Sequence, residues 1–159
     1  MEAEPNNVLD KVQSLSLELK DERRRRQALE RELARKEAES LEERAEEVHD
    51  EIKLLAVRVA DNTAIGTLRE MSDSLKDKLG RSIVVLGTVS EDKPVFVASV
   101  APALVSEGYH AGNIVAATSE VTGGSGGGKA TLAQGGGKDK AKLNEALRLV
   151  KELITPEPQ

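Results

Sequence analysis

The segment 122–142 holds the residues of this chain that are best suited to binding an anionic ligand. Eight of the 13 glycines fall in residues 123–137, as the clusters GGSGGG and GGG on either side of KATLAQ. Four lysines accompany them: Lys129, Lys138, Lys140 and Lys142. With Asp139 as the one acid, the segment carries +3 (4 − 1), although the whole chain carries −5. Because glycine lacks a Cβ, its amide can approach a phosphate closely, and the lysines attract the anion. The segment therefore predicts a main-chain surface for a phosphate-bearing ligand.

We expect both glycine clusters, the adjacent lysines and one glutamine to contact a nucleic-acid backbone. The candidate nucleic-acid-binding residues are Gly123, Gly124, Gly126, Gly127, Gly128, Lys129, Gln134, Gly135, Gly136, Gly137, Lys138 and Lys140. Gly135–Gly137 run towards the start of the last predicted helix, where unpaired amides and the helix dipole attract anions. Contacts of this kind position a nucleic acid without selecting its bases.

Two other interpretations of the segment compete with this one. A Gly/Ser run is also typical of a flexible linker, and spacing alone leaves that alternative open. Gly123, Gly128 and Lys129 fit the phosphate loop G-x-x-x-x-G-K, but Ala130 stands where Ser or Thr would bind Mg²⁺. The sequence therefore does not favour a nucleoside triphosphatase.

The chain offers no residues for catalysis or for a metal site. It has no cysteine, and its two histidines, His49 and His110, stand in unrelated places with no obvious catalytic or metal-binding partners. We interpret both as surface or capping residues. No His, Cys, Asp or Glu lies between Val121 and Lys138. We therefore expect no catalytic residue, no zinc site and no cofactor.

A long helix is expected to precede the domain that positions these glycines. Residues 7–46 are highly charged and carry a thin apolar seam with heptad-like spacing. The seam residues are Val8, Val12, Leu15, Leu19, Leu29 and Leu33. A seam on an exposed helix predicts a partner, either a second copy of the chain or another domain. The alternative is a single solvated helix held by charge pairs.

The remainder of the chain predicts a small α+β domain. We expect strands at 53–60, 82–89 and 94–100, with residues 90–93 forming a hairpin turn between the last two. Helices are expected from the caps Asp61, Asn62 and Thr63 to Gly80, from about 110 to 120, and finally after a cap at Asp139. The tail TPEPQ is expected to be disordered. The fold class is α+β, with a long helical arm (1–50) and a small mixed sheet, flanking helices and a glycine-rich loop (51–159).

The stretch from Ala111 to Ile154 resembles the carboxy-terminal end of alanyl-tRNA synthetases. The matching features are Ala111-Gly112, GGSGGGK, Ala133-Gln134 followed by Gly135–Gly137, Lys138-Asp139 and Ala146-Leu147. Four positions depart from the family pattern. Ala130-Thr131 stand where the family usually has Pro-Asp, Lys129 where it often has Arg, and Ser125 where Lys is common. Losing the guanidinium weakens the case for a bidentate phosphate contact at Lys129.

The resemblance implies a non-catalytic module that holds the elbow of tRNA(Ala) and supports aminoacylation and editing. It also implies that the module forms a homodimer through the arm or packs on upstream synthetase domains. It implies that the parent protein is an alanine-tRNA ligase and that ATP, Mg²⁺ and Zn²⁺ belong to upstream domains. Two alternatives are the substrate-binding domain of a DHH-type phosphoesterase and a purely structural coiled-coil dimerisation module. The chain shows no signal peptide and no membrane-length apolar run, so we expect a cytoplasmic protein without membrane contact.

Overall fold

The computed structural model describes residues 5–48 and 51–154, and it has the predicted α+β architecture. The chain divides into two compact units, Met1–Lys36 and Glu37–Gln159. The predicted disordered tail (155–159) and His49 lie outside the described residues. None of the described helices combines the length and the apolar character that crossing a membrane requires.

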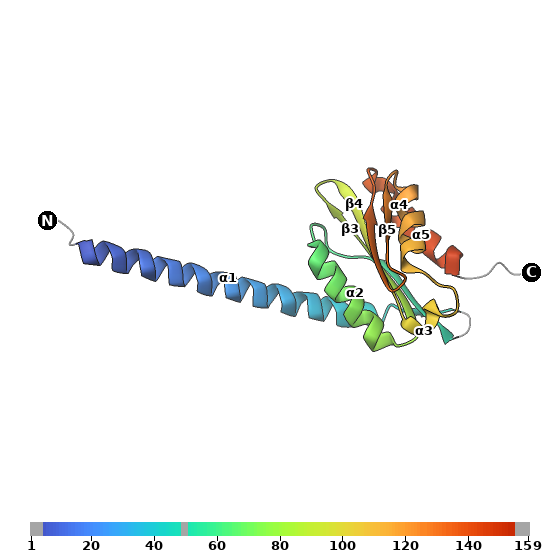
Figure 1. Cartoon of the computed structure of the whole chain (residues 1–159), viewed down its shortest axis with the longest axis horizontal. Helices are drawn as coiled ribbons and strands as arrows, with labels where there is room; N and C mark the ends of the chain where they lie inside the picture. Colours follow the sequence, from blue (N-terminus) through green and yellow to red (C-terminus); the bar gives the residue numbers. More distant parts are fainter. Residues whose placement is uncertain (1–4, 49–50, 155–159) are drawn as a thin grey trace, which may run out of the picture. The chain divides into compact units, whose positions relative to one another are not determined.

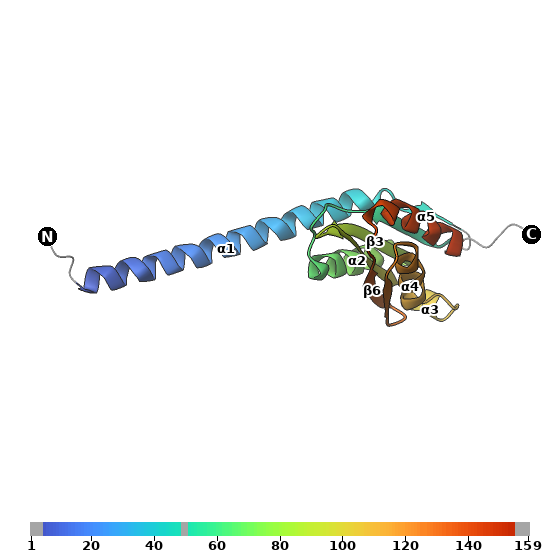
Figure 2. The ribbon, with the colours of Figure 1, turned by 90° about the horizontal axis from the view of Figure 1, so that it is seen from above.

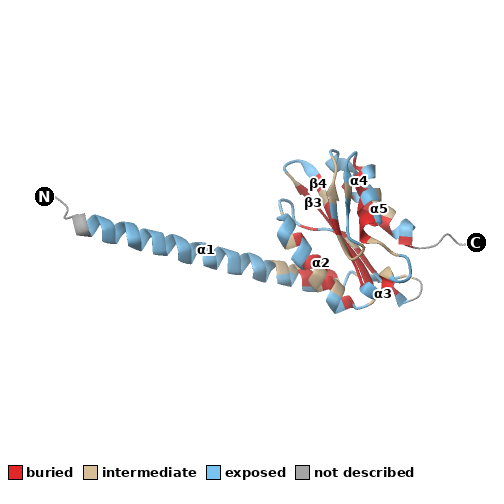
Figure 3. Ribbon diagram, viewed as in Figure 1, coloured by how far each residue is buried: buried red, intermediate tan, exposed pale blue. Residues whose placement is uncertain are grey.

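Helix α1 (Pro5–Glu42) forms the first unit and extends into the second, close to the predicted 7–46. All side chains from Asn7 to Leu33 are exposed (Figure 3). The six predicted seam residues are each 50–65% exposed. The helix ends four residues before the predicted position because a turn, with Arg44 N–H donating to Leu41 O, leads into the first strand. Ala38 and Leu41, near the end of α1, are buried.

A six-stranded mixed sheet is the centre of the second unit (Figure 1). Its strand order is β1-β2-β3-β4-β6-β5, with β2 and β3 parallel and every other pair antiparallel. The strands are β1 (Glu46–Glu47), β2 (Lys53–Arg58), β3 (Ser82–Ser90), β4 (Lys93–Val100), β5 (Ser125–Gly128) and β6 (Leu132–Gly136). Three of them match the predicted strands, and the parallel pair is connected through helix α2 (Ile65–Leu79).

The two faces of the sheet carry different helices (Figure 1). On one face, α2 packs on β3 and β4, and Ser72 and Ser99 share a buried hydrogen bond of 2.8 Å. The other face carries α4 (Ala111–Val121), close to the predicted 110–120, and α5 (Leu143–Ile154). Phe96 and Ala98 alternate with Ser99 along β4, so they point into the core under α4 and α5. Two short helices, α3 (Pro102–Val105) and the 3₁₀ turn η2 (Lys140–Lys142), complete the fold.

Turn and cap predictions have mixed outcomes. The β3–β4 hairpin is confirmed, with Glu91 and Asp92 at φ 51° and 62° as its two turn residues. Helix α2 ends at Gly80 as predicted, with φ 76°. The predicted caps Asp61–Thr63 are wrong, because α2 starts after Ala64 without a side-chain cap. Those three residues instead form the turn after β2, where Asp61 binds Arg58 and the Thr63 hydroxyl donates to Ala60 O.

Candidate functional site

The glycine segment forms a β-hairpin rather than the predicted loop. β5 and β6 pair through Ser125↔Gly136, Gly126↔Gly135, Gly127↔Gln134 and Gly128↔Ala133. Lys129 N–H donates to Leu132 O at 3.0 Å and closes the turn. β6 also pairs with β4, so both glycine clusters are held in the sheet. The flexible-linker alternative is therefore wrong for this segment.

Glycine is required in this hairpin because helix α4 lies directly on it (Figure 2). A Cβ at Gly126 would lie 2.6 Å from Val115 Cγ1, and a Cβ at Gly135 would lie 2.5 Å from Ser119 Oγ. Gly124 and Gly137 have backbone or side-chain atoms still closer, from Gly136 and Thr122 respectively. Gly127, in contrast, has nothing within 4 Å of the added Cβ. Most of the glycines thus serve close packing, and Gly127 faces open space.

At the predicted anion site, the start of the last helix, several main-chain amides already have partners within the fold. Gly137 N–H donates to Pro94 O, and the amides of Lys138 and Asp139 both donate to Thr122 O. Asp139 does act as the predicted cap, since its carboxylate accepts from Ala141 N–H at 3.0 Å. The amides of Gly137, Lys138, Asp139 and Ala141 are therefore already paired, and the capping carboxylate supplies the negative charge that an anion would bring.

Free main-chain groups lie instead along the outer edge of β5, the last strand of the sheet. In an antiparallel pair, alternate residues direct their N–H and C=O groups to the partner strand and away from it. Because Lys129 bonds to Leu132, Gly127 and Ser125 also point to β6, whereas the main-chain groups of Gly126 and Gly128 point away from it. The Gly128 carbonyl lies against Gly112 of α4, so at that residue only the N–H group faces the edge. Gly128 and the neighbouring Lys129 are exposed. The main-chain surface predicted from the glycines is thus reduced to this edge.

The predicted lysines do not gather at one place. Lys129 sits at the turn of the hairpin, whereas Lys138 and Lys140 follow its opposite end. Lys140 Nζ binds Asp92 Oδ1 at 2.9 Å, and this hydrogen bond, with the attraction between the charges, lowers the pKa of Asp92 below its ordinary value. Gln134 is exposed on the face opposite α4, paired with Gly127. Lys129 and Lys138 are exposed cations, while the charge of Lys140 is balanced.

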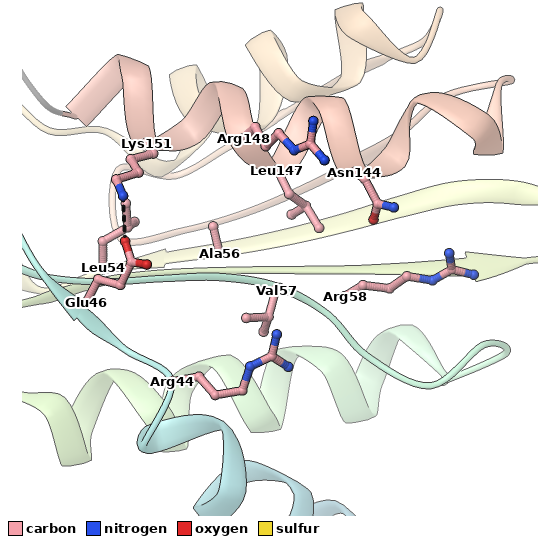
Figure 4. Close-up of a pocket in the computed structure, with 10 residues that line it drawn as sticks. All are labelled: Arg44, Glu46, Leu54, Ala56, Val57, Arg58, Asn144, Leu147, Arg148 and Lys151. Carbon is pink, nitrogen blue, oxygen red and sulfur yellow. Dashed lines mark hydrogen bonds and ion pairs between the residues drawn. The ribbon is translucent and has the colours of Figure 1, made fainter.

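A second cationic feature, which the sequence pattern did not predict, lies at the other edge of the sheet (Figure 4). It is a groove of about 440 Å³ between the β1–β2 edge and α5. Its lining residues are Arg44, Glu46, Leu54, Ala56, Val57, Arg58, Asn144, Leu147, Arg148 and Lys151. One signal was available in the sequence: Asn144, Arg148 and Lys151 recur at four- and three-residue intervals, on one face of the predicted last helix. No comparable spacing in the sequence marked Arg44 or Arg58 as part of this groove.

Among the described residues, side chains that could hold a metal are not brought together. In the part of the chain that the structure describes, no cluster of three or more His, Cys, Asp or Glu side chains has the arrangement of a metal site. His110 occupies the N-cap position of α4, but its side chain makes no capping hydrogen bond. Its Nδ1 and the Ser119 hydroxyl are buried without a hydrogen-bond partner among the described residues.

Comparisons with known proteins agree with one another over most of the chain. The DHHA1 domain model matches residues 51–155. An alanine–tRNA ligase from Dehalococcoides mccartyi is 50% identical over 154 residues, which are 97% of this chain and 18% of that protein. The alanine–tRNA ligase of Exiguobacterium sibiricum is 38% identical, again over 97% of this chain and over 17% of its own length. The chain thus spans less than a fifth of these relatives.

A solved structure matches the fold. The crystal structure of the C-Ala domain from Aquifex aeolicus alanyl-tRNA synthetase superposes with a TM-score of 0.62 at 31% identity. The match covers 70% of this chain and 98% of that domain. The similarity therefore includes nearly the complete solved domain.

Proposed function

Because the chain belongs to the DHHA1 domain family and, within it, to the C-Ala domains of alanyl-tRNA synthetases, we propose that it binds tRNA as an accessory module of an alanine–tRNA ligase. In this proposal, aminoacylation and editing are catalysed by other domains of the ligase, to which this chain shows no match. The phosphoesterase alternative has less support, since the relatives above are alanine–tRNA ligases along 97% of this chain.

The observation that carries the proposal is the match to 98% of a solved C-Ala domain. The geometry adds support at the glycine hairpin, where the outer edge of β5 offers the main-chain groups of Gly126 and the N–H of Gly128 beside the Lys129 ammonium. Amides and a lysine suit phosphate oxygens, and such contacts position RNA by its backbone and shape. We propose the tRNA elbow as the region held.

Titration with whole tRNA(Ala) and with an acceptor minihelix that lacks the elbow tests this proposal. We expect tighter binding of whole tRNA and an affinity that falls with rising salt, because phosphate contacts release counterions. Lys129→Gln should weaken binding, whereas Lys78→Gln, at an exposed position of α2, serves as the matched control. Equal affinity for the two RNAs, or an affinity independent of salt, contradicts elbow binding.

We further propose that α1 mediates self-association. Its six seam residues are apolar and 50–65% exposed, which is costly for a helix that stays alone in water. A second copy of the same helix would bury them in a coiled coil. Light scattering over a concentration series measures this directly, and a strictly monomeric mass at high micromolar concentration contradicts it.

A further inference from the structure

The groove between β2 and α5 has the charge and the form of a binding site for a phosphate backbone. Arg148 and Asn144 are carried by α5 above β2, while Arg44 lies below it (Figure 4). The Lys151–Glu46 ion pair, 2.8 Å long, lies at one end and Arg58 at the other. Leu54, Ala56 and Leu147 supply an apolar lining between the charges. The four cations thus come from the α1–β1 turn, from β2 and from α5.

Two of these cations are available to a ligand. Arg58 binds Asp61 at 2.8 Å and Lys151 binds Glu46, so their charges are balanced. Arg44 and Arg148 are both exposed, and among the described residues neither has an ion-pair partner. A guanidinium presents several N–H donors in a planar fork that matches phosphate oxygens. Two unpaired guanidinium groups on opposite sides of a groove therefore point to a phosphodiester as the ligand.

The exposed edge of β2 adds main-chain groups to the same place. Lys53 and Val59 direct their N–H groups to β3, so the even-numbered residues of β2 point outwards. Leu54 is paired with β1, and Ala60 N–H is covered by the Glu37 carboxylate at 3.4 Å. Ala56 and Arg58 keep outward N–H and C=O groups facing the groove. An open β2 edge of two residues is too short for an extended peptide to pair with it as an added strand. This disfavours an acidic peptide as the ligand of the groove.

We propose that this groove is a second RNA-binding surface, in which Arg44 and Arg148 bind phosphates of a ribose-phosphate strand and the apolar lining accommodates a ribose or base. The inference rests on the proposed function and deepens it, since the ligand is a segment of the same tRNA. The groove and the glycine hairpin lie at opposite edges of the sheet. Four strand spacings of about 4.8 Å separate β2 from β5, so the two surfaces engage phosphates about 20 Å apart.

The decisive variant is Arg44→Gln combined with Arg148→Gln in the full chain. Each lost phosphate contact should lower the salt slope of log K by about 1, and together they should weaken RNA binding roughly tenfold or more. The control is Arg69→Gln with Lys78→Gln, which removes two exposed cations of α2 that do not line the groove. It should change affinity less than about twofold, since a cation contributes a phosphate contact only where the RNA lies against it. Both variants should keep the wild-type unfolding midpoint, because the replaced side chains are exposed.

The outcomes separate this inference from the proposed function. If the wild type prefers whole tRNA and the groove variant binds as tightly as the wild type, the groove assignment is wrong and the proposed function stands. If the wild type binds tRNA and minihelix equally but the groove variant loses both, elbow binding is wrong and the groove stands. Equal losses in the groove and control variants, or displacement of RNA by polyglutamate as efficiently as by unlabelled RNA, would overturn the groove as an RNA site.

Discussion

At the scale of single residues, some glycines of the hairpin are packed under a helix and others are not. Gly126 and Gly135 face each other across the hairpin, and both lie under Val115 and Ser119 of α4. Gly127 lies next to Gly126 in the chain, but its missing side chain would point into open space. Composition could show that glycine was concentrated here, but it could not show which glycines a helix covers.

Gly126→Ala should therefore destabilise the protein, whereas Gly127→Ala should not. The added methyl group at residue 126 meets Val115 Cγ1 at 2.6 Å and the Gly135 backbone at 2.7 Å, so α4 or the hairpin must shift. We expect a loss of about 1–3 kcal/mol in unfolding free energy. For Gly127→Ala we expect a change within about 0.5 kcal/mol, or a slight gain from the less flexible unfolded chain. Urea denaturation of both variants measures this, and equal effects would contradict the packing role of Gly126.

The Asp92–Lys140 pair makes a prediction about pH. Lys140 lowers the pKa of Asp92 in the folded protein, so the pair stabilises the fold above the pKa of the unfolded chain. That contribution is lost as pH falls through the folded-state pKa. Lys140→Gln should move the Asp92 pKa up towards its ordinary value, measured by NMR titration of the carboxyl carbon. Lys142→Gln, an exposed lysine of the same 3₁₀ turn, should leave it in place. An Asp92 pKa that responds equally to both variants would rule out a specific pair.

At the scale of elements, periodicity predicted the four longer helices and the apolar strands. α1, α2, α4 and α5 carry apolar residues at helical spacing, and β3 and β4 are rich in Val and Ile, so local pattern was sufficient. β5 and β6 were missed because glycine has no side chain to alternate and is depleted in strands. They are strands because β4 offers an edge to which β6 pairs along five residues. A tertiary contact of that kind leaves no mark on the local sequence.

A pair of variants in α1 distinguishes a coiled coil from non-specific hydrophobic association. Leu15→Lys with Leu19→Lys places two charges in the seam, whereas Leu9→Lys with Leu17→Lys places them outside it. All four leucines lie on α1 and are at least 50% exposed, so the two variants are matched in exposure and charge. We expect the seam variant to be monomeric by light scattering and the control to self-associate as the wild type does. Equal loss of self-association in both would contradict the proposed seam.

At the scale of the whole molecule, the basic groove shows what local pattern cannot supply. Arg44 follows α1 and Arg148 lies on α5, more than a hundred positions later in the sequence, and only the fold brings them to one groove. The lysines chosen from the sequence were neighbours in the chain, but the hairpin carries Lys129 and Lys138 to opposite ends. Proximity in sequence and proximity in space thus gave different candidate surfaces. Because β2 and β5 lie near opposite edges of the sheet, the strand order sets the distance between the groove and the glycine hairpin.

The division into two compact units predicts that their proposed roles are separable. Residues 37–159 retain the whole sheet, its helices and the buried Ala38 and Leu41, so this fragment should unfold at the wild-type midpoint. It should also bind tRNA with wild-type affinity while losing self-association, because the exposed seam ends at Leu33. A fragment that begins at residue 44 loses both buried side chains and should be less stable by about 3 kcal/mol or more. Thermal unfolding, tRNA titration and light scattering of the two fragments test each part. If the 37–159 fragment unfolds at a lower temperature than the full chain, residues 1–36 stabilise the domain, and the two roles are not separable.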